Sequence, residues 1–123
     1  MVAAYLDSEL VGYALGYGLS SNTRWWTGLQ TDQPAAFFVE DGTRTFALNE
    51  LVVAPERRRR GYGRMLHDAL LDGRPEERAT LLVRPDNPAA ELYEKLGWRE
   101  AGRQQPFPDS PTFRSMVLPL TTR

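Results

Sequence analysis

The sequence predicts an α/β (α+β) fold in which helices flank a mixed, mostly antiparallel β-sheet. Three observations support this prediction. Short apolar runs flank polar turns near both ends of the chain, as in antiparallel hairpins. Two central segments follow the 3.6-residue period of a helix, and each comes after a short apolar run. The main elements follow the order β-β-β-α-β-α-β-β. The strand–helix–strand pieces in this order favour neighbouring parallel strands.

Composition limits the chemistry available to the chain. Its 123 residues suit a single domain, residues 1–123, with one modest core. No apolar run approaches the ~20 residues of a transmembrane helix, and the N-terminus does not resemble a signal peptide. The absence of cysteine excludes disulfides, thiolate catalysis and cysteine-based zinc sites, and the single histidine, His67, excludes a His-rich metal site. We therefore expect a cytoplasmic protein whose chemistry uses carboxylates, tyrosine, arginine and backbone groups.

The first two strands are expected at Val2–Leu6 and Leu10–Leu19, around the polar turn Asp7-Ser8-Glu9. A Gly-Tyr pair recurs along the second strand, at Gly12-Tyr13 and Gly16-Tyr17. Glycine inside a strand often marks a bulge or a close approach of another backbone. A twisted edge strand explains the same pattern equally well.

The next segment, Ser20 to Ala36, is predicted to be irregular because it is polar and has no clear period. It contains the adjacent pair Trp25-Trp26. Two exposed tryptophans are costly, so they are expected to cover the edge of the core, line a pocket or make a subunit contact.

A second hairpin is predicted from Phe37–Glu40, the turn Asp41-Gly42 and a long strand, Thr43–Val53. Every second residue from Phe46 to Val52 lies on one face of that strand, and Glu50 is the charged member of this row. A carboxylate among apolar side chains is partly desolvated, which raises its pKa and suits a general base. A salt bridge to an arginine is the alternative.

A basic glycine turn follows this strand. Leu51-Val52-Val53 is stopped by Pro55, four arginines occupy 57–60, and Gly61-Tyr62-Gly63 opens a helix that ends near Gly73. The first amides of a helix have no internal partner and lie at the positive end of its dipole. The turn therefore predicts an anion site, and phosphate is the expected anion. A solvated arginine run is the alternative. The apolar residues that predict the helix are Tyr62, Leu66, Ala69 and Leu70.

The second helix follows a short apolar strand, Thr80–Val83. Asn87 suits the N-cap, Pro88 suits the first helical position, and Gly97 ends the helix. Tyr93 is expected beside the apolar face rather than at its centre. That face is predicted to consist of Ala89, Leu92 and Leu96. The final strands are expected at Trp98–Gly102 and Phe113–Leu120, joined by a proline-rich loop.

These two stretches together resemble the signature segments of the GNAT (GCN5-related N-acetyltransferase) superfamily. The family's acetyl-CoA loop has the pattern Gln/Arg-x-x-Gly-x-Gly/Ala, which Arg58-Arg-Arg-Gly61-Tyr-Gly63 matches. The second signature is an Asn before a helix that carries a Tyr and is closed by Leu-Gly-Phe/Trp. Asn87, Tyr93 and Leu96-Gly97-Trp98 match it. The resemblance covers residues 2–120 and implies a GNAT-like fold.

The resemblance also implies an activity, the transfer of an acetyl group from acetyl-CoA, as cosubstrate, to an amine. This implied reaction needs no metal. Turn amides would bind the CoA pyrophosphate, the backbone of the preceding strand would pair with pantetheine, and the asparagine would contact the cofactor arm. The implied cofactor-binding residues are Leu51, Val52, Val53, Arg58, Arg59, Arg60, Gly61, Tyr62, Gly63, Arg64 and Asn87. Within the arginine run, Arg57 is expected to be only a solvated neighbour.

The implied catalytic residues are Tyr93 and Glu50. Tyr93 would protonate the leaving thiolate, and a backbone amide near Val52 would polarise the thioester carbonyl. Some relatives carry a glutamate base on the fifth strand, where this chain has Leu82, so Glu50 is the candidate base. The acceptor is expected to be a small-molecule or peptide amine, and a homodimer is possible. Neither nucleic acid nor membrane is expected as a partner, since the arginine run is short and the net charge is −1.

The chain departs from the family pattern at its start. The family normally opens with a strand and two helices before the first hairpin seen here, and those helices wall the acceptor site. The Trp25-Trp26 segment or a partner would then supply the wall, or the form is a truncated one. The alternative function is therefore a catalytically weak CoA-binding subunit or regulatory partner.

Overall fold

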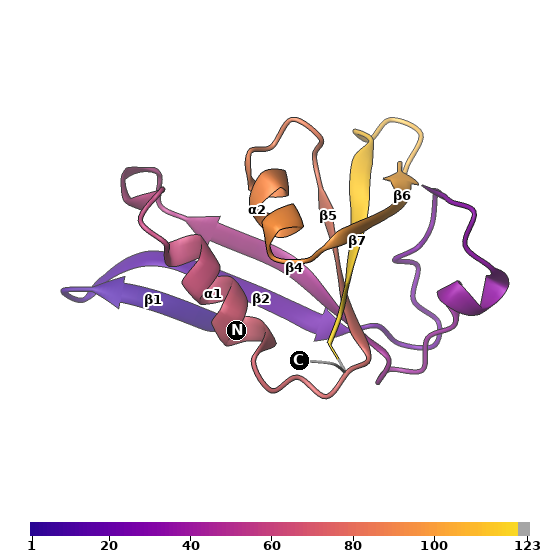
Figure 1. The fold of residues 1–123 in the computed structure, drawn as a ribbon, viewed down its shortest axis with the longest axis horizontal. Coiled ribbons are helices and arrows are strands. Elements are labelled where there is room, and N and C mark those ends of the chain that lie inside the picture. The colour runs from indigo at the N-terminus through magenta and orange to yellow at the C-terminus, as the bar shows by residue number, and fades with distance from the viewer. Residues whose placement is uncertain (121–123) are drawn as a thin grey trace. The chain divides into compact units, whose positions relative to one another are not determined.

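The computed structural model describes residues 1–120, which contain seven strands, two α-helices and two 3-10 turns. The strands form one sheet in the order β1-β2-β4-β5-β7-β6-β3 (Figure 1). The elements are β1 (Val2–Leu6), β2 (Glu9–Gly18), β3 (Leu29–Gln30), η1 (Ala35–Phe38), β4 (Thr45–Val53), η2 (Pro55–Arg57), α1 (Tyr62–Leu71), β5 (Arg78–Val83), α2 (Ala89–Lys95), β6 (Arg99–Gln104) and β7 (Phe113–Pro119). The predicted mixed, mostly antiparallel sheet is confirmed. None of the helices within residues 1–120 is long and apolar enough to cross a membrane.

The chain divides into two compact units. The first contains Met1–Tyr17 and Leu48–Arg74, and the second contains Gly18–Ala47 and the chain from Pro75 onward. Strand β4 begins in the second unit and ends in the first.

The first unit is built on the predicted hairpin. β1 pairs antiparallel with β2, and the turn is made by Asp7 and Ser8, whose φ angles are 50° and 70°. Helix α1 lies against this hairpin (Figure 1). Its buried side consists of Leu66, His67, Leu70 and Leu71. The prediction that Ala69 belongs to this side was wrong: Ala69 is exposed, because the buried side is turned toward Leu71. The helix ends at Leu71, close to the predicted stop at Gly73, which has a φ of 71°.

The second unit is centred on β5. This strand pairs in parallel with the start of β4 and antiparallel with β7, and five of its six residues are buried. The predicted apolar strand Thr80–Val83 is therefore confirmed, and it begins two residues earlier than predicted. β7 continues the sheet to β6, and β6 pairs with the two-residue strand β3.

The predicted second hairpin is wrong in its first arm. Residues 35–38 form the 3-10 turn η1 instead of a strand. Backbone carbonyls there bond to arginine side chains rather than to a neighbouring strand: Arg44 Nη1 donates to Ala36 O (2.7 Å) and to Val39 O (2.9 Å). The Asp41-Gly42 turn is present, with Asp41 Oδ1 accepting from the Thr43 amide at 2.8 Å and Gly42 at a φ of 89°.

The segment predicted to be irregular contains β3 and a tryptophan core. Trp26 is buried with Leu19 and Ala47, and Trp25 packs against this cluster. Of the alternatives for the tryptophan pair, covering the core is the one that the structure supports. β3 escaped prediction because two residues are too short for a periodic signal.

Helix α2 buries a different side from the one predicted. Ala90 and Tyr93 are its buried residues, whereas Leu92 and Leu96 are only half-buried. Tyr93 therefore lies at the centre of the buried side rather than beside it. Its ring packs edge-on against Trp98, with the ring centroids 5.9 Å apart. Gly97 ends the helix as predicted, with a φ of 102°.

Candidate functional site

The basic turn has the backbone of an anion site. Gly61 precedes α1 with φ 84° and ψ 1°, and no side chain caps the helix. Arg59 also has a positive φ, 64°, which is uncommon for a residue with a side chain. The amides that open α1 are thus left for an external acceptor. A Cβ added to Gly63 would meet only the Leu51 and Val53 side chains, at 3.8 and 4.0 Å.

Two arginines of the turn contact neighbouring strands, and the next two do not have such a contact among the interactions described. Arg57 is half-buried and pairs with Glu9 at 3.8 Å, so the expectation that it is merely solvated was wrong. Arg58 Nε donates to the Val53 carbonyl at 3.3 Å, and this contact folds the run back on β4. Arg59 and Arg60 are exposed. Arg64 is also exposed and lies 3.7 Å from Asp68, one helical turn on.

The backbones of β2 and β4 approach closely beside this turn. A Cβ on Gly12 would lie 2.6 Å from the Val52 carbonyl oxygen, and the Ala54 amide donates to Val11 O at 2.8 Å. The close-approach interpretation of Gly12 is therefore confirmed. The edge-strand interpretation is wrong for β2, because β1 and β4 flank it on either side.

Glu50 is exposed, although its strand pattern predicted a partly desolvated carboxylate. The prediction fails because β4 is buried only from Thr45 to Leu48 and leaves the core at Asn49. Its contact is also different from the expected arginine salt bridge. The Tyr13 hydroxyl donates to Glu50 Oε2 at 2.8 Å. That hydrogen bond, together with the charge of the carboxylate, raises the pKa of the Tyr13 phenol.

The remaining site candidates belong to the second unit. Tyr93 is 6% exposed, and burial raises the pKa of its phenol above the ordinary value. Asn87 is exposed, and its Oδ1 accepts from the Ala89 amide at 2.9 Å. Pro88, which was predicted to be the first helical residue, is instead the N-cap of α2 and has no side-chain capping bond. The bond from Asn87 reaches the first helical residue, Ala89. Glu50 belongs to the first unit, whereas Tyr93 belongs to the second.

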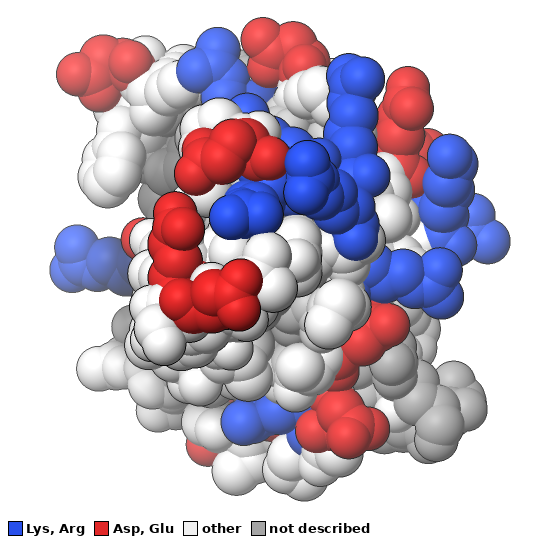
Figure 2. Space-filling model, turned by 90° about the vertical axis from the view of Figure 1, so that its left-hand side faces the viewer, with Lys and Arg blue, Asp and Glu red and all other residues white. Residues whose placement is uncertain are grey.

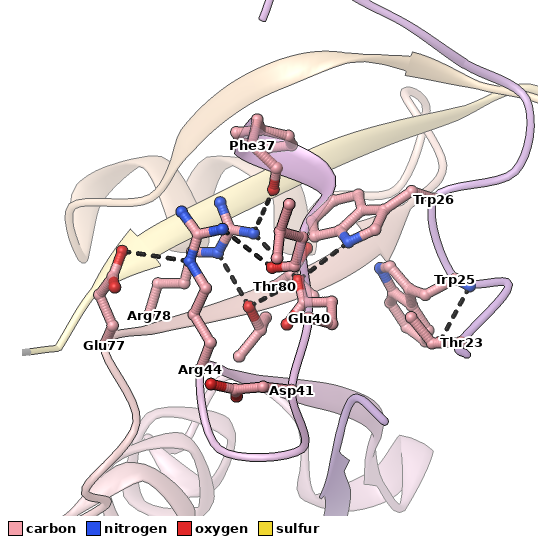
Figure 3. A network of polar contacts seen from close by, with 12 residues as sticks. Thr23, Trp25, Trp26, Phe37, Glu40, Asp41, Arg44, Glu77, Arg78 and Thr80 are labelled. Atoms are coloured by element: carbon pink, nitrogen blue, oxygen red, sulfur yellow. Dashed lines mark hydrogen bonds and ion pairs between the residues drawn. The ribbon is translucent and has the colours of Figure 1, made fainter. Parts of the chain in front are cut away.

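A buried ion pair in the second unit was not predicted from the sequence. Arg78 Nη2 lies 3.0 Å from Glu40 Oε2, and their side chains are 7% and 0% exposed (Figure 3). The Trp26 indole donates to the same oxygen at 3.0 Å. The guanidinium also lies over the Phe37 ring, 4.4 Å from its centroid. Burial lowers the pKa of Arg78, and the hydrogen bond to Glu40 opposes that change.

Metal ligands and basic surfaces add little to the site. Within residues 1–120, no group of three or more His, Asp or Glu side chains could hold a metal ion. On the face in Figure 2, Lys and Arg side chains gather in the upper half, with Asp and Glu side chains beside them.

A match to a protein-family model identifies the family of this chain. The family model described as "Acetyltransferase (GNAT) family" matches residues 1–98. The chain therefore belongs to the GNAT acetyltransferase family. No curated protein matches the sequence significantly.

Solved structures share the fold at low sequence identity. Ard1 from Thermoplasma volcanium is 21% identical, with a TM-score of 0.66 and coverage of 93% of this chain and 66% of that one. Naa20 from Chaetomium thermophilum, solved with a bisubstrate analogue, is 21% identical, with a TM-score of 0.68 and coverages of 96% and 64%. The ribosomal-protein-S18-alanine N-acetyltransferase from Escherichia coli is 24% identical, with a TM-score of 0.65 and coverages of 94% and 65%. The chain spans slightly less than two thirds of these structures.

Proposed function

We propose that this protein is an acetyl-CoA-dependent N-acetyltransferase that acts on an amine. The observation that supports it best is the start of α1 after Gly61, which no side chain caps. This turn resembles the acetyl-CoA loop of the GNAT family, to which the chain belongs. Arg59 and Arg60 in the same turn and Arg64 in the first turn of α1 are exposed, and positive charge near those amides suits a pyrophosphate. The cytoplasmic location, the homodimer and the single domain stay predictions.

The proposed reaction is a direct transfer. Acetyl-CoA supplies a thioester, whose carbonyl carbon is attacked by the acceptor nitrogen. The new C–N bond forms and the C–S bond breaks. Glu50 takes the proton that the nitrogen loses, and Tyr93 gives its phenolic proton to the departing thiolate. The products are the N-acetylated amine and CoA, and solvent returns both residues to their starting states.

Replacing Gly63 with aspartate is expected to abolish acetyl-CoA binding. The structure has room for a Cβ at this position, so the fold should persist, whereas the new carboxylate repels and crowds a pyrophosphate at the start of α1. Isothermal titration calorimetry of the wild type should give a micromolar Kd, about −8 kcal/mol, and no heat for Gly63→Asp.

Gly63→Ala is the matched control, because it adds the Cβ without the charge. It should bind acetyl-CoA within a few-fold of the wild type. Wild-type protein that shows no binding up to millimolar acetyl-CoA would contradict the proposed function. Equal binding by wild type and Gly63→Asp would show that the pyrophosphate does not bind at this turn.

A further inference from the structure

The contact between Tyr13 and Glu50 adds a residue to the proposed reaction. Tyr13 lies on β2 and Glu50 on β4, and these strands are neighbours in the sheet. The phenolic oxygen is 2.8 Å from Glu50 Oε2, a normal distance for a charge-assisted O–H···O bond. We propose that Tyr13 is a positioning residue, whose hydroxyl holds the Glu50 carboxylate in the orientation that receives the acceptor amine. This inference rests on the proposed function.

The surroundings of the two side chains explain why one can orient the other. Tyr13 is half-buried, and the next residue, Ala14, is completely buried. Its neighbour Gly12 lies so close to the Val52 carbonyl that a Cβ would be 2.6 Å from it. The backbone that carries Tyr13 is thus held close to β4. Glu50, by contrast, is exposed, and a free glutamate there would sample several rotamers.

The hydrogen bond leaves the carboxylate able to meet a substrate. It uses Oε2, and an ionised carboxylate has a second oxygen that accepts hydrogen bonds. A primary amine, neutral or protonated, supplies the N–H donors that this oxygen needs. The position on β4 is also suitable, because Glu50 directly precedes Leu51–Val53, the backbone assigned to pantetheine.

Tyr13 itself does not take the amine proton. The hydrogen bond to Glu50 and the charge of that carboxylate raise the pKa of the phenol, so its protonated form dominates below about pH 10. It therefore acts as a donor to Glu50 throughout the neutral range. A cross-strand pair that only adds stability is the competing explanation, and the experiment must separate the two.

The test compares Tyr13→Phe with Tyr5→Phe, which removes a hydroxyl from an exposed tyrosine of the same hairpin. CoA release is followed with a thiol reagent, and the chain contributes no background because it has no cysteine. The acceptors are a primary alkylamine, a polyamine, an aminoglycoside and a short lysine-containing peptide with a free N-terminus. We expect Tyr13→Phe to lower kcat/KM for the accepted amine about tenfold, with an unchanged Kd for acetyl-CoA. Tyr5→Phe should have no effect.

The Glu50→Gln background shows whether Tyr13 acts through Glu50. In that background, Tyr13→Phe should cause little further loss, because the carboxylate that it orients is gone. An equal loss in both backgrounds, or no loss in either, would overturn the inference. If wild type binds acetyl-CoA but acetylates none of the amines, the proposed function fails, and the inference fails with it. Wild-type turnover that Tyr13→Phe leaves unchanged overturns the inference alone.

A second readout needs no acceptor. The ultraviolet titration of wild type minus that of Tyr13→Phe isolates one of the five tyrosines. The pKa of Tyr13 should lie above the ordinary tyrosine value in wild type and fall toward it in Glu50→Gln. An unchanged Tyr13 titration in Glu50→Gln would show that the phenol does not hold the carboxylate in solution.

Discussion

Replacing Arg78 with methionine is expected to destabilise the protein by about 3–5 kcal/mol, because the substitution leaves a buried carboxylate without its cationic partner. Glu40 has a side chain that is 0% exposed, and its Oε1 has no hydrogen-bond partner in the structure of residues 1–120. Arg78 also donates to Phe37 O at 2.6 Å and to Thr45 Oγ1 at 2.9 Å. Methionine fills part of the space but satisfies none of these acceptors.

Urea denaturation followed by tryptophan fluorescence measures this effect as a lower midpoint at a constant m-value. The double variant Arg78→Met/Glu40→Gln should recover part of the loss, because it removes the uncompensated charge while keeping an oxygen for the Trp26 indole. Arg84→Met is the matched control. Its pair with Asp86, at 3.5 Å, joins side chains that are 59% and 77% exposed, so the change should cost less than about 1 kcal/mol. Equal stabilities of Arg78→Met and Arg84→Met would contradict the assigned role of the buried pair.

Replacing Tyr93 with phenylalanine is expected to lower kcat by about 10²–10⁴-fold while leaving acetyl-CoA affinity within about twofold. The ring and its edge-on contact with Trp98 are retained, and the hydroxyl that would donate the proton is removed. Rapid-quench turnover and calorimetry on the same preparation separate the two quantities. Tyr5→Phe, an exposed tyrosine, should match wild type in both. Undiminished turnover by Tyr93→Phe would remove Tyr93 as the general acid.

The pH dependence provides a further measurement of the same role. Burial raises the pKa of the Tyr93 phenol, so the protonated, acid-competent form is fully present below about pH 10, the ordinary tyrosine value. It is lost only as pH rises through the raised pKa. Wild-type kcat should therefore show no decline due to Tyr93 between pH 7 and 10. A decline within that range that disappears in Tyr93→Phe would contradict this account.

Local sequence signals predicted the parts of the fold that depend on local interactions. Asp7 and Ser8 adopt left-handed conformations that few residues other than Gly, Asn and Asp accept, and the polar turn around them was recognisable. Gly73 and Gly97 end their helices for the same backbone reason. The starts of α1 and α2 were also recognisable, because helix capping and glycine turns depend on residues that are adjacent in the sequence.

The failures come from interactions between distant residues. Phe37–Glu40 has the composition of a strand, yet Arg44 and Arg78 side chains take the carbonyls that a strand partner would have bonded. Arg78 is 38 residues from Glu40, and no periodic pattern joins them. A charged residue that opens an otherwise apolar strand such as β5 was the available signal.

The candidate site shows the same division. The turn around Gly61 was identified from its sequence, whereas the environment of Glu50 was not. The apolar row predicted burial, but β4 leaves the core at Asn49, and strand periodicity cannot show where a strand becomes exposed. Tyr13 was noticed only as the neighbour of Gly12, because its contact with Glu50 spans 37 residues.

Simultaneous measurement of both products tests the proposed acetyl transfer most directly. Wild-type protein is incubated with acetyl-CoA and each amine of the panel, free CoA is measured by its thiol, and the acetylated amine is measured by mass spectrometry. The proposal predicts equal amounts of CoA and N-acetylated amine with at least one acceptor, and neither product with Gly63→Asp. Tight binding of acetyl-CoA without acetylation of any amine would contradict it and would identify the protein as a CoA-binding one instead.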